Sequence, residues 1–129
     1  MIRKMATCCA LIALAIPIGP AQSQTRQSPS WGAIASVQSW HGYAFDLPTR
    51  AAAELSALAQ CDKAAGQARC VVRVAFDRAC GALATGNFGE WGAASAPTSA
   101  AASEAAAAQC NGHLPAEPCK VVVNVCSAR

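Results

Sequence analysis

Two alanine-rich segments of the chain end in the same dipeptide, "AAAELSALAQC" at 51–61 and "AAASEAAAAQC" at 100–110. Their closing cysteines are 49 residues apart. The same shift places "WGAIAS" at 31–36 on "CGALAT" at 80–85, and the register needs no gap over residues 31–74. Agreement in order and spacing over this length indicates an internal duplication.

The first unit begins with a pattern typical of a β-hairpin followed by a helix. Residues 31–37 and 43–47 have the small, β-branched or alternating pattern of strands, and the turn-like stretch 38–42 separates them. The segment 48–61 then predicts a helix, with Thr49 as its N-cap and a run of alanine, the best helix former.

A third strand completes each unit. "CVVRVAF" at 70–76 predicts a strand whose alternation puts Cys70, Val72, Val74 and Phe76 on one face and Arg73 on the other. The second unit repeats the pattern. We therefore predict an α+β domain over 31–126, built from a duplicated ββαβ unit (31–79 and 80–126), with a mainly antiparallel sheet and two alanine-rich helices packed on it.

The two predicted helices differ on one face. Leu55 and Leu58 are expected to meet the sheet, yet their counterparts in the second helix are Glu104 and Ala107. Either the second helix is rolled so that Glu104 reaches water, or Glu104 is partly buried with a partner, because an unpaired buried carboxylate costs several kcal/mol.

Residues 1–23 predict a secretory signal peptide, cleaved after Ala21 or Ser23. Its apolar run is shorter than the roughly 20 residues of a membrane span, so we expect no stable membrane anchor after cleavage. A lipoprotein would use Cys8 or Cys9, but little apolar sequence precedes them. The polar residues 24–30 predict a flexible leader. The chain is therefore expected to be periplasmic or secreted.

The charge of the chain argues against nucleic acid as a partner. Arg3 and Lys4 leave with the signal peptide, so eight of the ten basic side chains remain against seven acidic ones. No run of Lys or Arg is present to follow a phosphate backbone.

Six cysteines follow the signal peptide, and an even number in an exported chain favours disulfides. Cys61 ends a predicted helix and Cys70 begins the next strand, so a bond between them would tie helix to sheet. The duplication then implies Cys110 with Cys119, which leaves Cys80 to pair with Cys126. A zinc site is disfavoured because the spacing lacks CxxC.

The residues "WGAIA", "PTRAAAELSALAQC", "CVVRVAF" and "CGALATG" together resemble the bacterial family catalogued as domain of unknown function 4189. The resemblance covers residues 31–126 and implies an exported, disulfide-bonded domain. Some members of the family are treated as secreted effectors and others as partners of toxins. No agreed catalytic residues come with the resemblance, so none are transferred.

No catalytic or cofactor-binding motif is present in the sequence. There is no Gly-x-Ser-x-Gly, no His-Glu-x-x-His and no glycine-rich phosphate loop, and paired cysteines leave no thiolate nucleophile. We expect no cofactor and no metal. The histidines His41 and His113 fall in predicted turns or loops, where a solvated side chain is the ordinary interpretation.

These features favour a non-enzymatic binding module with a protein partner, most concretely a periplasmic immunity protein or an inhibitor of a toxin or enzyme. The alternative is a secreted effector or hydrolase that acts on an envelope or host target, with His41 and acids such as Glu90 in its site. A structural envelope protein is a third possibility.

A binding patch is predicted at the two hairpin turns. Aromatic residues gather in or beside these turns, where polar residues are usual, and the shift of 49 residues aligns His41 with Glu90. Alternatively, the aromatic rings fold back over the alanine-rich core. The predicted binding residues are Trp40, His41, Tyr43, Phe88, Glu90 and Trp91.

Overall fold

The computed structural model describes residues 15–22, 26–66 and 69–128. Within these residues the order strand, strand, helix, strand occurs twice, which confirms the duplicated ββαβ unit. The elements are β1 (Trp31–Val37), β2 (Trp40–Leu47), α1 (Arg50–Ala65), β3 (Val71–Asp77), β4 (Cys80–Thr85), β5 (Trp91–Ala96), α2 (Ser99–Asn111) and β6 (Lys120–Cys126).

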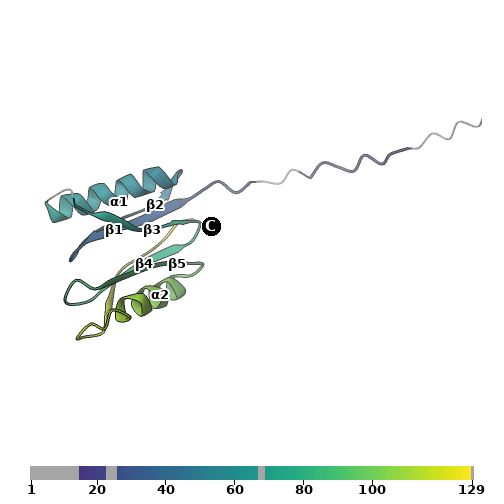
Figure 1. Cartoon of the computed structure of the whole chain (residues 1–129). Helices are drawn as coiled ribbons and strands as arrows, with labels where there is room; N and C mark the ends of the chain where they lie inside the picture. Colours follow the sequence, from purple (N-terminus) through teal and green to yellow (C-terminus); the bar gives the residue numbers. More distant parts are fainter. Residues whose placement is uncertain (1–14, 23–25, 67–68, 129) are drawn as a thin grey trace, which may run out of the picture.

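The strands form two antiparallel sheets, one from each unit, rather than one continuous sheet. Their strand orders are β2-β1-β3 and β5-β4-β6. Figure 1 shows the sheets stacked between the helices, with α1 covering one outer face and α2 the other. The domain is thus a four-layer arrangement of helix, sheet, sheet and helix.

Three apolar cores hold these layers together. Each helix packs on its own sheet through a cluster made mostly of alanine and cysteine. The core between the sheets contains the larger side chains Ile34, Phe76, Leu83 and Val123, together with Ala93. Small residues therefore lie beneath the helices, and the large apolar side chains join the two units.

Each helix contacts its sheet through residues spaced four apart, which recur on one face of a helix. Ala53, Ala57 and Cys61 are fully buried in α1, and their equivalents in α2 are buried in the same way. Gly42 of β2 permits the close approach, since a Cβ atom there would lie 2.3 Å from the Cys61 nitrogen. The equivalent Gly92 of β5 faces α2 equally closely.

This packing corrects the predicted helix face. Leu55 is 67% exposed, because the sheet-facing positions are the small residues rather than the leucines, and Leu58 is only half-buried at the margin of the core. Glu104, the counterpart of Leu55, is also exposed. Both helices are therefore oriented alike, and Glu104 reaches water without any roll of α2.

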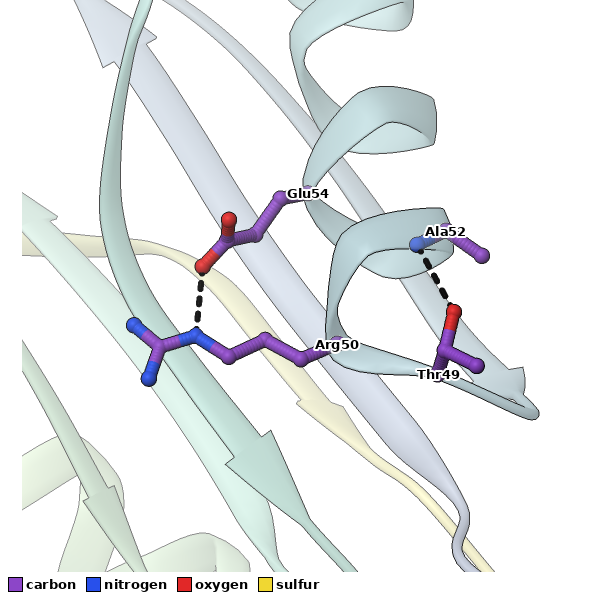
Figure 2. A network of polar contacts seen from close by, with 4 residues as sticks. All are labelled: Thr49, Arg50, Ala52 and Glu54. Atoms are coloured by element: carbon purple, nitrogen blue, oxygen red, sulfur yellow. Dashed lines mark hydrogen bonds and ion pairs between the residues drawn. The ribbon is translucent and has the colours of Figure 1, made fainter.

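The predicted helix start is confirmed at Thr49, whose hydroxyl accepts a hydrogen bond from the Ala52 nitrogen at 3.1 Å (Figure 2). Figure 2 also shows the ion pair between Arg50 and Glu54, one turn apart, at 2.7 Å. Thr98 caps α2 in the same manner.

A β-bulge corrects the predicted faces of β3. The register between β1 and β3 shifts between Ile34 and Ala35, and Arg73 is the extra residue on β3. Val74 consequently packs in the core between the sheets, whereas Cys70 packs against the α1 core. The strict alternation expected from sequence is wrong here, because a bulge places two residues opposite one and resets the alternation. The second unit carries the same bulge at Val122 of β6.

The turn of the second hairpin is one residue longer than that of the first, which changes how the two units align. Ser36 pairs with His41 in the first hairpin, and its counterpart Thr85 pairs with Trp91 in the second. The structural equivalent of His41 is therefore Trp91, and the expected alignment of His41 with Glu90 is wrong. A register shift near the end of β2 restores the common spacing.

All three predicted disulfides are present. Cys61 is bonded to Cys70 and Cys110 to Cys119, so each helix end is tied to the strand that follows it. Cys80 and Cys126 are bonded across the neighbouring strands β4 and β6.

The N-terminal part of the chain is only partly described. The predicted signal peptide lies largely outside the described residues, and residues 15–22 and 26–30 contain no helix or strand. Of the predicted leader, Ser28 and Ser30 contact the domain through Arg78 and Asp77. None of the described helices has the length and apolarity needed to cross a membrane.

Candidate functional site

The two hairpin turns lie side by side at one end of the sandwich, opposite the end where the N-terminal segment enters (Figure 1). A hollow of about 350 Å³ separates them, lined by Gln38 and Ser39 from the first turn and by residues 86–89 from the second. We call this region, comprising residues 37–41 and 85–91, the hairpin end. The fold thus brings together two turns that are far apart in the sequence.

The second turn is held in one conformation by hydrogen bonds within it. The Gly86 nitrogen donates to the Glu90 carbonyl oxygen, and the Phe88 nitrogen donates to the Glu90 carboxylate, both at 2.8 Å. Gly89 has φ of 83°, which a three-residue hairpin loop requires at this position. These contacts leave the Phe88 side chain 78% exposed at the tip of a fixed turn.

These contacts give Glu90 a structural role. Its carboxylate accepts a hydrogen bond from the backbone of its own turn, and it lies so close to Gly86 that a Cβ atom there would clash with it. The carboxylate that the sequence offered as a binding or acid–base group is engaged in shaping the loop that presents Phe88.

Trp91 contributes to the contact between the two sheets. The Arg73 guanidinium lies over its ring at 4.2 Å from the ring centre, and Arg73 Nε donates to the Ser36 hydroxyl at 3.0 Å. Partial burial lowers the pKa of Arg73 from its ordinary value, but a guanidinium remains charged throughout the physiological range. Arg73 therefore joins β3, β1 and β5 at the margin of the hairpin end.

Trp40 lies on a different face from Trp91. It pairs with Val37, which packs against the α1 core, and it lines a hollow of about 260 Å³ with Val37, Ala65 and Arg69. Its ring is about half-exposed, at 48%. The two tryptophans thus border the hairpin end from opposite faces and do not form one aromatic cluster.

Tyr43 lies further along β2, away from the turn. It pairs with Ile34 on the face turned toward the other sheet, and its ring is stacked near that of Phe45, with 6.5 Å between ring centres. His41 is half-buried on the same strand. Tyr43 and Phe45 lie outside the hairpin end, whereas His41 is at its margin.

The predicted binding residues therefore lie in three places. Phe88 and Glu90 share the second turn with Trp91 beside it, Trp40 and His41 border the first turn, and Tyr43 is set apart on β2. The sequence analysis did not identify Arg73 as a residue of this site, although a single cation in an apolar strand was a visible signal. His113, expected in a solvated loop, is exposed and borders a hollow of about 270 Å³ with Phe88–Trp91.

The described part of the chain holds no group of metal-ligating side chains. Among residues 15–22, 26–66 and 69–128, no three His, Cys, Asp or Glu side chains are grouped so as to hold a metal ion. Phe88 borders two hollows at the hairpin end. The hairpin end therefore presents an exposed aromatic ring, on a turn fixed by hydrogen bonds, beside these hollows.

Residues 31–126 match the family model described as domain of unknown function DUF4189. The chain belongs to this family. Searches of curated proteins and of solved structures gave no match to the chain. The DUF4189 match spans both ββαβ units and all three disulfides, so the whole described sandwich corresponds to this one family domain.

Proposed function

We propose that this DUF4189 domain is an exported, non-enzymatic module that binds a protein partner through the hairpin end, as a periplasmic immunity protein or an inhibitor of a toxin or enzyme. Three disulfides support an oxidising compartment, since such bonds persist mainly outside the cytoplasm. Within that setting, periplasmic location or secretion is part of the proposal.

The observation that carries the proposal is the exposure of Phe88. A large aromatic side chain that is 78% exposed on a turn fixed by two hydrogen bonds is preorganised to contact a partner. Preorganisation limits the conformational entropy lost on association. Aromatic anchors that fill a partner's pocket account for much of the binding energy in protein interfaces.

The experiment is a pull-down from periplasm and from culture medium with the mature oxidised protein, followed by titration of the purified partner. A stoichiometric partner is expected, and Phe88→Ala should weaken its binding at least tenfold, about 1.4 kcal/mol. Leu55→Ala is the matched control, because Leu55 is a similarly exposed apolar side chain on α1, remote from the turns.

Two results would contradict the proposal. One is turnover of cell-wall material by the purified protein alone, which would favour a secreted effector or hydrolase. The other is a partner whose affinity is unchanged by Phe88→Ala and equally unchanged by Trp40→Ala and Trp91→Ala, which would place the contact elsewhere on the domain.

A further inference from the structure

Two segments far apart in the sequence meet at the end of the sandwich opposite the hairpin end. Ser30 immediately precedes β1, and Ser127 immediately follows β6. Both residues are buried, with exposures of 8% and 3%. Figure 1 shows the C label close to the point where the N-terminal segment enters the sandwich. The segment before the first unit therefore lies beside the segment after the second.

Part of this contact repeats with the duplication. The Arg78 nitrogen donates to the Ser30 carbonyl oxygen at 2.8 Å, and after the shift of 49 residues the Ser127 nitrogen donates to the Ala79 carbonyl oxygen at 2.9 Å. Each bond joins the residue after the third strand of a unit to the residue before its first strand. These bonds hold each segment on its own sheet, and neither joins one sheet to the other.

Asp46 lies at a β-bulge of β2 that β5 does not have. Phe45 and Asp46 are both opposite Gly32, whereas Ser95 alone is opposite Gly81 in the second unit. Asp46 has φ of 56°, in the left-handed region that aspartate enters more readily than most residues. A bulge changes the direction of the residues that it contains. Asp46 is therefore free to make contacts that the second unit does not repeat.

Asp46 binds both segments. Its carboxylate oxygen Oδ1 accepts hydrogen bonds from the Ser30 hydroxyl at 3.1 Å and from the Ala128 nitrogen at 2.6 Å. Its own backbone nitrogen donates to the Ser127 hydroxyl oxygen at 3.1 Å. One residue of the first sheet thus joins the residue before β1 to the two residues after β6.

We propose that Asp46 is a latch that couples these segments, so that residues 28–30 and residues 127–128 undock together in one local opening. Contacts that depend on one another open as a unit while the remainder of a domain stays folded. Loss of the residues after Cys126, or capture of either segment by another molecule, then releases the other segment. The latch lies at the end opposite the hairpin end, so this proposal does not depend on the proposed function.

Amide hydrogen exchange of the mature oxidised protein, followed residue by residue by NMR, tests the coupling. The reporters are the amides of Ala128, Ser30 and Arg78, of which only that of Ala128 donates to Asp46. Asp46→Gly removes the carboxylate, and glycine keeps the left-handed backbone available. This variant should speed exchange at least tenfold at Ala128 and severalfold at Ser30 and Arg78. Loss of local bonds alone would leave Arg78 unchanged.

Two variants serve as controls for this substitution. Ser95→Gly is the matched control, because Ser95 is exposed at the corresponding position of the other sheet, opposite Gly81. It should leave all three exchange rates unchanged. Asp46→Asn keeps an oxygen acceptor and a residue that tolerates the left-handed region, so it should retain most of the protection.

A chain that ends at Cys126 tests the coupling without any change at Asp46. Exchange should rise severalfold at Ser30 and Arg78, although neither amide is bonded to the residues removed. Far-UV circular dichroism and slow exchange at Leu83, in the core between the sheets, establish that each variant is folded.

Three outcomes would overturn the proposal. In the unmodified protein, exchange of the Ala128 amide at the rate of an unstructured peptide would mean that the latch is open. A rise confined to Ala128 in Asp46→Gly would mean that the two segments are held independently. The third outcome requires no variant to fold: if the three amides of the unmodified protein, at low denaturant, exchange through openings of clearly different free energy, the segments do not open together.

Discussion

The side-chain oxygen of Gln60 accepts a hydrogen bond from the backbone nitrogen of Tyr43 at 2.6 Å. In the second unit, Gln109 accepts from the Ala93 nitrogen at 3.3 Å. Tyr43 and Ala93 lie on β2 and β5, which are edge strands of their sheets. Unpaired edge groups invite pairing with other chains, so each glutamine occupies a backbone donor of an edge strand. Glutamine therefore precedes cysteine in both repeats because its side chain binds the neighbouring edge strand.

Gln60→Ala should lower the free energy of unfolding by about 1 kcal/mol, since a hydrogen bond of this kind contributes roughly 0.5–1.5 kcal/mol. Denaturant unfolding monitored by circular dichroism measures the change. Ser56→Ala is the control, because Ser56 is exposed on the same helix and alanine suits a helix well. If Gln60→Ala is as stable as this control, the contact with Tyr43 has no energetic weight.

The repeated cysteine and the residue after it complete this helix end. Each cysteine is bonded to the start of the next strand, and the following Asp62 or Asn111 accepts a hydrogen bond from the nitrogen of the partner cysteine, Cys70 or Cys119. Three consecutive residues thus fix the helix to an edge strand and to the third strand of its unit. The repeat of Gln-Cys-Asx is the signature of this contact.

Removing the bond between Cys80 and Cys126 should cost more stability than removing the bond between Cys61 and Cys70. The first closes a loop of 46 residues and the second a loop of 9. In the chain-entropy model these loops correspond to about 4 and about 2.7 kcal/mol. Paired cysteine-to-alanine variants, unfolded in denaturant, give the two values. A larger loss for the short loop would show that its helix contact outweighs loop entropy.

Gly42→Ala should severely destabilise the first unit. The added methyl group would lie 2.3 Å from the Cys61 nitrogen and 2.4 Å from the Ala57 carbonyl oxygen, both backbone atoms that cannot move aside without shifting α1. Overpacking of this kind costs typically 1–3 kcal/mol and sometimes more.

Gly112→Ala is the matched control for this prediction, since its nearest neighbour would lie at 3.2 Å and its backbone is right-handed helical. The melting temperature should fall clearly for Gly42→Ala and little for Gly112→Ala. Equal melting temperatures would mean that α1 is not seated closely on β2.

The sequence predicted those parts of the structure that depend on repeated local patterns. The register of the two units predicted the order of elements and the equivalent bonds Cys61–Cys70 and Cys110–Cys119. Cys80 and Cys126 have no counterparts in the first unit and were left to pair with each other. The prediction from sequence failed where the backbone departs from a regular repeat. The bulge at Arg73 and the extra residue in the second turn have no compositional signal, so the face of Val74 and the counterpart of His41 in the second unit were predicted wrongly.

The alanine-rich helices also misled the prediction of the core. A hydrophobic pattern identifies leucines as buried residues, yet the sheet-facing positions of α1 are Ala53, Ala57 and Cys61, because Gly42 lets the backbones approach. The sequence also did not show that the strands form two sheets, because this arrangement depends on contacts between the two units. Phe76 makes the most direct of these contacts. A Cβ atom on either Gly32 or Gly81 would clash with this ring, so one side chain spans both sheets.

The contact between Arg73 and Trp91 should couple the two units energetically. The guanidinium lies 4.2 Å from the ring centre and is partly shielded from water, where a cation–ring interaction is worth roughly 0.5–2 kcal/mol. A double-mutant cycle with Arg73→Met and Trp91→Leu, read by denaturant unfolding, should give a coupling energy in this range. The equivalent cycle with Val122→Ala and His41→Ala should give a value near zero, since that pair contains no cation over an aromatic ring. Equal coupling in the two cycles would mean that sheet packing alone, rather than the cation over the ring, holds the units together.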